Sequence, residues 1–176
     1  MNLPDLLRQI NRIFAYRQIP YAVIGGYAVA AWGEERATRD MDLFCAFDSR
    51  RLMEALHEEG MQFEHRIGDC DDPVSELIRI DMGSATEPFE VDVLIGIRNA
   101  PAGVLNRVRM LHIGDVSIPV ASPEDMILLK LLAGSARDLE DAGSIVEIQR
   151  HKLDLNLLRR LCPDSLQSSL EKLLTD

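Results

Sequence analysis

Two aspartates stand two positions apart in a segment that is otherwise apolar. Asp40 and Asp42 flank Met41 within the stretch RDMDLF. In a β-strand, residues two apart point to the same face, so the two carboxylates are expected to project together while Met41 and Leu43 point to the other face. Like charges at this spacing favour a shared divalent cation, because hard cations prefer carboxylate oxygens.

A second segment repeats the pattern. In FEVDVLIG, Glu90 and Asp92 alternate with apolar residues. If the two strands are neighbours, Asp92 joins Asp40 and Asp42 in a three-carboxylate cluster, which suits magnesium or manganese better than zinc. The alternative is a solvated strand face, which is ordinary on sheets exposed on one side.

A glycine pair precedes these aspartates along the chain. Gly25 and Gly26 separate the apolar run 21–24 from an alanine-rich segment. Glycines between a strand and a helix permit positive φ and close backbone approach, and the helix N-terminus offers unpaired N–H groups to an anion. A phosphate site beside metal-binding carboxylates is what phosphoryl or nucleotidyl transfer needs. A tight turn with no further role is the alternative.

These residues require a sheet that brings them together. Hydrophobic periodicity and turn residues predict, in chain order, a helix over 3–14, a strand over 21–24, a short buried helix over 27–32 and a strand over 41–47. A helix capped by Asp48 and Ser49 then runs to about Glu59. The strands ELIRIDMG and FEVDVLIG, joined through 84–88, follow it, and after them a hairpin around Gly114 and Asp115. The segment GDCDDP, residues 68–73, is expected to be a polar turn between a helix and a strand. From Ser122 onward the pattern is helical, with a Ser cap followed by Pro.

The predicted fold class is therefore α/β (α+β), a mixed sheet with helices packed on it. At 176 residues the chain fits a single compact unit, with a core over 1–121 and a C-terminal helical segment over 122–176. A net charge of -10 argues against broad binding to nucleic acid or to anionic membranes. Without a membrane-length apolar run or a leader, a cytoplasmic location is expected. The three cysteines lack the CxxC spacing of a zinc site.

The order of these motifs resembles the nucleotidyltransferase superfamily that shares the DNA polymerase β palm fold. The resemblance is closest to the small bacterial branch that includes AbiEii-type toxin nucleotidyltransferases. The matching positions are Gly25, Gly26, Gly33, Arg36, Thr38, Asp40, Asp42 and Asp92, followed by Lys130 and the segment RDLED at 137–141. Many superfamily members have Gly-Ser where this chain has Gly-Gly, so backbone N–H groups would hold the phosphate here.

The resemblance implies magnesium- or manganese-dependent transfer of a nucleoside monophosphate from a nucleoside triphosphate, such as ATP, to an acceptor, with release of pyrophosphate. It also implies a role for each matched residue. Asp40, Asp42 and Asp92 would be the metal ligands and catalytic residues, with Asp92 as the base toward the acceptor hydroxyl. The nucleotide would contact Gly25, Gly26, Arg36, Thr38 and Lys130.

Several alternatives stay open at this point. Asp138 and Asp141 could hold Lys130 or Arg137, or they could only favour the start of a helix. The acceptor could be a small molecule such as an antibiotic, a tRNA end or a protein side chain. The chain could act with an antitoxin or with a second copy of itself. The alternative functions are a non-catalytic nucleotidyltransferase-fold module in a toxin–antitoxin pair and a metal-dependent nuclease.

Overall fold

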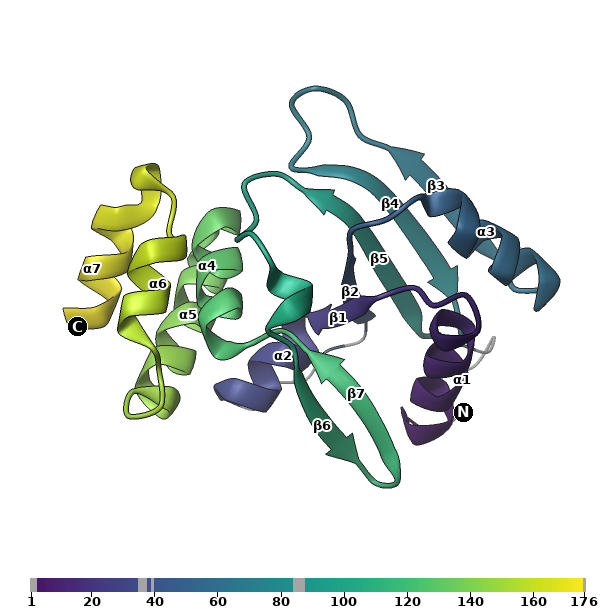
Figure 1. Ribbon diagram of the computed structural model, residues 1–176, viewed down its shortest axis with the longest axis horizontal. Coiled ribbons are helices and arrows are strands. Elements are labelled where there is room, and N and C mark those ends of the chain that lie inside the picture. The colour runs from purple at the N-terminus through teal and green to yellow at the C-terminus, as the bar shows by residue number, and fades with distance from the viewer. Residues whose placement is uncertain (1–2, 35–37, 39, 84–87, 176) are drawn as a thin grey trace.

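The computed structural model describes residues 3–34, 38, 40–83 and 88–175. Its strands are β1 (Tyr21–Ile24), β2 (Asp40–Cys45), β3 (Phe63–Ile67), β4 (Val74–Asp81), β5 (Glu90–Ile97), β6 (Arg109–Ile113) and β7 (Val116–Val120). Together they form a seven-stranded sheet in the order β3-β4-β5-β2-β1-β7-β6 (Figure 1). β2 pairs in parallel with β5, and β1 with β7, while the other neighbours are antiparallel. The mixed α/β sheet predicted from the sequence is confirmed.

The central strands have one fully buried face. Met41 and Leu43 of β2 and Val91 and Val93 of β5 have no exposed surface, because their side chains point into the apolar core. Residues that alternate with them, beginning with Asp40, point to the opposite face, which is partly open. The alternation of charged and apolar residues therefore reflects a sheet that is covered differently on its two sides.

The helices gather at two ends of the sheet (Figure 1). At one end lie α1 (Leu3–Tyr16) and α3 (Ser49–Glu58), which contact each other. At the other end lie α4 (Pro123–Ala133), α5 (Ala136–Gln149), α6 (Leu155–Leu161) and α7 (Gln167–Thr175). The short helix α2 (Gly25–Trp32) contacts β1, β2, α4 and α5, and so joins the sheet to this second group. Two 3-10 turns, η1 (Val104–Asn106) and η2 (Asp164–Leu166), complete the described elements.

Local sequence signals explain how several helices begin. The Asp48 carboxylate accepts a hydrogen bond from the backbone N–H of Arg50 at the start of α3, as the predicted cap requires. The Ser122 hydroxyl accepts one from the backbone N–H of Asp125 at the start of α4. The expected boundary near residue 121 coincides with this start, although a division of the chain into two segments stays a prediction. None of the helices in the described ranges is long and apolar enough to cross a membrane.

Four details differ from the sequence-based prediction. The strand β3 was not expected, and the polar segment 68–73 connects it to β4 instead of joining a helix to a strand. β3 is an edge strand with mostly exposed or half-buried residues, so its sequence carries little hydrophobic signal. α2 begins at Gly25, two residues before the predicted start, and β2 covers 40–45 instead of 41–47.

Candidate active site

The parallel pairing of β2 with β5 brings the predicted carboxylates onto one part of the sheet. Asp42 is the register partner of Asp92, and Asp40 is the partner of Glu90. The Thr38 hydroxyl lies 2.9 Å from the Asp40 carboxylate oxygen Oδ1 and donates a hydrogen bond toward it. The strand order thus supplies what the sequence could only assume, namely that the two acidic strands are neighbours.

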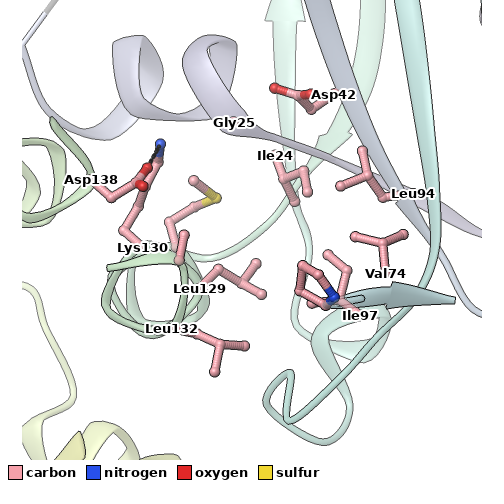
Figure 2. A pocket seen from close by; sticks show the side chains of 13 residues that line it. Ile24, Gly25, Asp42, Val74, Leu94, Ile97, Leu129, Lys130, Leu132 and Asp138 are labelled. Atoms are coloured by element: carbon pink, nitrogen blue, oxygen red, sulfur yellow. Dashed lines mark hydrogen bonds and ion pairs between the residues drawn. The ribbon is translucent and has the colours of Figure 1, made fainter. Parts of the chain in front are cut away.

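Gly25 and the Asp42 carboxylate lie unusually close together. A Cβ added at Gly25 would stand 1.8 Å from Asp42 Oδ2, and the Gly25 φ of +60° is itself unfavourable for other residues. Figure 2 shows Asp42 beside the start of α2. Only glycine therefore lets this carboxylate approach the helix N-terminus. The glycine pair forms the start of α2, and the close contact is made at its first residue, Gly25.

Replacing Gly25 by alanine is expected to weaken nucleotide binding strongly. The new Cβ would force the Asp42 carboxylate away from its position, in addition to the cost of the left-handed backbone, about 1–2 kcal/mol. Calorimetric titration with ATP and magnesium measures the affinity. Gly60→Ala is the matched control, because Gly60 has a φ of +66° with nothing within 4 Å of its added Cβ. Equal ATP affinities in the two variants would contradict a role for the close approach.

Asp92 is held by an arginine that the sequence analysis did not single out. Arg79 on β4 is the register partner of Asp92 on β5. Its Nε donates to Asp92 Oδ1 at 2.8 Å and its Nη2 to Oδ2 at 2.7 Å, and only 12% of the Asp92 side chain is exposed. The hydrogen bond to Asp92 also raises the pKa of the Arg79 guanidinium. Without the pairing of β4 with β5, no sequence signal connects these residues.

Lys130 is enclosed by the two aspartates whose role was left open. Its Nζ lies 2.8 Å from Asp138 Oδ1 and 2.8 Å from Asp141 Oδ2, and 12% of its side chain is exposed. Burial acts to raise the pKa of Asp138, but hydrogen bonds from Lys130 and Ser135 outweigh it and lower that pKa. Asp138 and Asp141 therefore hold Lys130, while Arg137 is exposed at the start of α5.

A pocket of about 360 Å³ connects Lys130 to the carboxylate strands (Figure 2). Its walls come from β1, β2, β4, β5 and α4, so it lies between the sheet and the C-terminal helices. The polar lining side chains are Asp42, Lys130 and Asp138, whereas most of the wall is aliphatic. A pocket with an apolar wall and a few convergent polar groups is the usual form of a small-molecule site.

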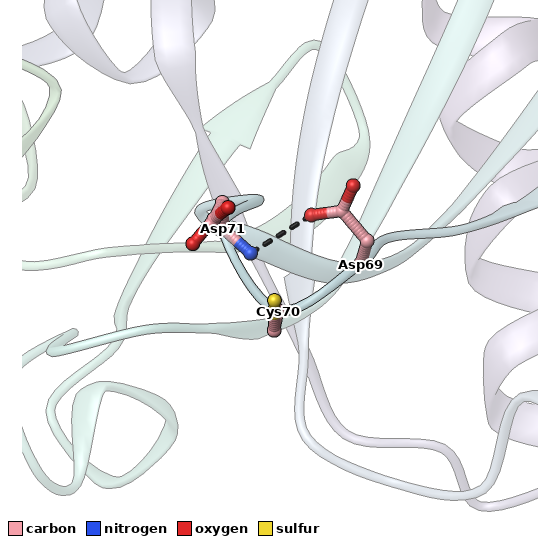
Figure 3. Close-up of side chains that lie close together, drawn as sticks. All are labelled: Asp69, Cys70 and Asp71. Carbon is pink, nitrogen blue, oxygen red and sulfur yellow. Dashed lines mark hydrogen bonds between the residues drawn. The ribbon is translucent and has the colours of Figure 1, made fainter.

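A different acidic group lies on the segment between β3 and β4 (Figure 3). Among the residues that the structure describes, Asp69, Cys70 and Asp71 form the only group of three potential metal ligands within 4.8 Å of one another. All three are exposed, and Asp69 Oδ1 accepts hydrogen bonds from the backbone N–H groups of Asp71 and Asp72. These bonds account for the cluster as part of a polar turn.

The predicted site residues are thus brought to one region, although not into one finished metal site. Asp40, Asp42 and Asp92 share a sheet face. Of these three, Asp42 lines the pocket, together with Gly25 and Lys130. Arg36 lies outside the described residues. Oxygen donors from two neighbouring strands, with room made by Gly25, fit a hard divalent cation. The assignment of each residue to metal or nucleotide stays a prediction.

Nearly the whole sequence matches the model of a known protein family. A family model described as "Nucleotidyltransferase of unknown function (DUF6036)" matches residues 1–173. No significantly similar sequence is found among curated proteins.

Several solved structures are similar to this one at low sequence identity. An antigenic nucleotidyltransferase-like protein from Paracoccidioides brasiliensis has a TM-score of 0.59 at 17% identity, covering 97% of this chain and 91% of that one. JHP933 from Helicobacter pylori has a TM-score of 0.54 at 21% identity, covering 98% and 76%. ANT(2")-Ia in complex with adenylyl-2"-tobramycin has a TM-score of 0.59 at 15% identity, covering 96% of both chains. At these identities, the similarity shows a shared fold.

Proposed function

This chain belongs to the nucleotidyltransferase family of unknown function whose model spans residues 1–173, and we propose that it transfers a nucleoside monophosphate from a nucleoside triphosphate to an acceptor hydroxyl. The observation that carries the proposal is the register of β2 with β5, which pairs Asp42 with Asp92 beside the start of α2. Carboxylates on adjacent strands next to a glycine-started helix combine a place for a cation with a place for phosphate.

Each group then has a defined task. Asp40, Asp42 and Asp92 would hold Mg²⁺ or Mn²⁺, which when bound stabilises the charge that develops on the phosphate. The acceptor hydroxyl oxygen bonds to the α-phosphorus, the bond from that phosphorus to the pyrophosphate oxygen breaks, and the hydroxyl proton passes to Asp92.

The remaining contacts position the triphosphate. The first backbone N–H groups of α2, at Gly25 and Gly26, face the anion in this proposal, with Arg36 and Thr38 on the segment before β2. Lys130 has three N–H donors, and its two aspartate partners leave one for a phosphate oxygen. The aspartates also fix the ammonium at the pocket wall, which reduces the entropy lost on binding.

Three classes of molecule are candidate acceptors of the nucleotide. ANT(2")-Ia with adenylyl-2"-tobramycin is a structural precedent for an antibiotic hydroxyl. A tRNA end and a protein side chain are the other acceptor classes. The resemblance to AbiEii-type proteins adds an antitoxin as a candidate partner.

Labelling identifies both substrates in one experiment. The protein is incubated with magnesium, cell extract and each of the four nucleoside triphosphates labelled at the α-phosphate. We expect label to appear on one acceptor from one preferred triphosphate, with pyrophosphate released and no transfer after chelation of the metal. Triphosphate binding without transfer would favour the non-catalytic module, and cleavage of nucleic acid in the extract would favour the nuclease.

A further inference from the structure

Both oxygens of the Asp92 carboxylate are occupied by one guanidinium. Arg79 approaches with Nε and Nη2 in parallel, at 2.8 and 2.7 Å, and its Nε also lies 3.4 Å from Glu90 Oε2. Such a fork matches a carboxylate in two places, and each of its charge-assisted hydrogen bonds is about twice as strong as one between neutral groups. In this arrangement, Asp92 faces Arg79 across the β4–β5 ladder.

The two hydrogen bonds from Arg79 fix the position of Asp92 relative to the other predicted metal ligands, Asp40 and Asp42. In the described part of the chain, Asp40, Asp42 and Asp92 do not place one oxygen each within 4.8 Å of one another. A cation that binds all three must draw these side chains closer together, and any movement of Asp92 toward it lengthens the two hydrogen bonds from Arg79. The guanidinium also offsets one negative charge in a patch that otherwise consists of four carboxylates, from Asp40, Asp42, Glu90 and Asp92.

We propose that Arg79 is a positioning residue that competes with the divalent cation for Asp92. It holds the carboxylate in place on the open face of the sheet while the site is empty, and it raises the cation concentration needed to assemble the site. The competition acts in two ways, because Arg79 covers the oxygen atoms and because its positive charge lowers the attraction of the patch for a second cation. This inference rests on the proposed function only in taking Asp92 as a metal ligand.

Direct measurement of Mn²⁺ binding tests the competition without any assay of turnover. Free Mn²⁺ is followed by electron paramagnetic resonance during titration of the full chain. Arg79→Met is expected to bind Mn²⁺ at least about tenfold more tightly than the unaltered protein, which corresponds to about 1.4 kcal/mol. Arg79→Lys, which keeps the charge but loses the fork, is expected to fall between the two.

Further variants show whether the effect passes through Asp92. Asp92→Asn should remove the gain, so that Arg79→Met adds nothing in the double variant. Arg66→Met is the matched control, because Arg66 pairs with Glu64 on the exposed strand β3 and its loss should leave the affinity unchanged. Circular dichroism confirms that each variant is folded.

The possible results separate this inference from the proposed function. Unchanged or weaker Mn²⁺ binding in both folded Arg79 variants would overturn the competition, even if Asp42→Asn abolished binding as the proposed function requires. Mn²⁺ binding that is absent from the unaltered protein, or that survives Asp42→Asn, would overturn the metal site and the competition together. If Arg79→Met did not fold, Arg79→Lys alone would decide, since competition predicts tighter binding and a purely structural role does not.

Discussion

Asp42→Asn is expected to lower nucleotide transfer by at least about a hundredfold while leaving the protein folded. Asparagine keeps the size of the side chain beside Gly25 but removes the negative charge that a cation needs. Because Asp42 is the register partner of Asp92 and neighbours Asp40 on the same face, removing its charge also relieves repulsion. Circular dichroism checks that the variant is folded. Transfer of α-phosphate label from ATP to the acceptor found in extract measures the activity.

The control for this variant is Glu64→Gln, which makes the same charge change on an exposed residue of β3. Its transfer rate should match that of the unaltered protein. Wild-type transfer in a folded Asp42→Asn variant would remove Asp42 from the site. Equal losses in Asp42→Asn and Glu64→Gln would point to a general effect of charge.

Asp125→Ala is expected to lower the free energy of unfolding by about 3 kcal/mol. The Asp125 carboxylate is fully buried, and Arg107 donates to it from Nη2 at 2.5 Å and from Nε at 3.0 Å, while the Ser122 hydroxyl donates at 2.7 Å. Removing the carboxylate leaves the largely buried Arg107 without its ionic partner. Thermal unfolding should show a melting temperature lower by roughly 6–12 °C.

Two further variants separate the buried pair from charge in general. Replacing both partners, in Arg107→Met with Asp125→Leu, should restore much of the stability, because no unpaired charge remains inside. Asp115→Ala breaks the exposed pair with Arg8 and should cause no measurable shift. A double variant as unstable as Asp125→Ala would show that the position needs the carboxylate for another reason. Because Asp125 anchors the first turn of the helix that carries Lys130, the same loss should also weaken triphosphate binding.

Local patterns in the sequence determined much of the secondary structure. The amphipathic helix at the start of the chain, the Ser122 and Asp48 caps and the hairpin around Gly114 each depend on residues close in sequence. The alternation around Asp40 and Asp42 likewise assigned the buried and open sides of β2, because side chains in a strand alternate by geometry alone. Such features can be predicted because their energetics involve only neighbouring positions.

Tertiary structure decided how these elements meet. Whether Asp42 would stand beside Asp92 depended on the strand order, which long-range packing selects. The edge strand β3, the fork from Arg79 to Asp92 and the enclosure of Lys130 by Asp138 and Asp141 likewise appear only after folding. The sequence by itself therefore determined the kinds of chemical group available and the side of the strand they occupy. Their partners come from contacts between residues far apart in the chain, for which local periodicity carries no signal.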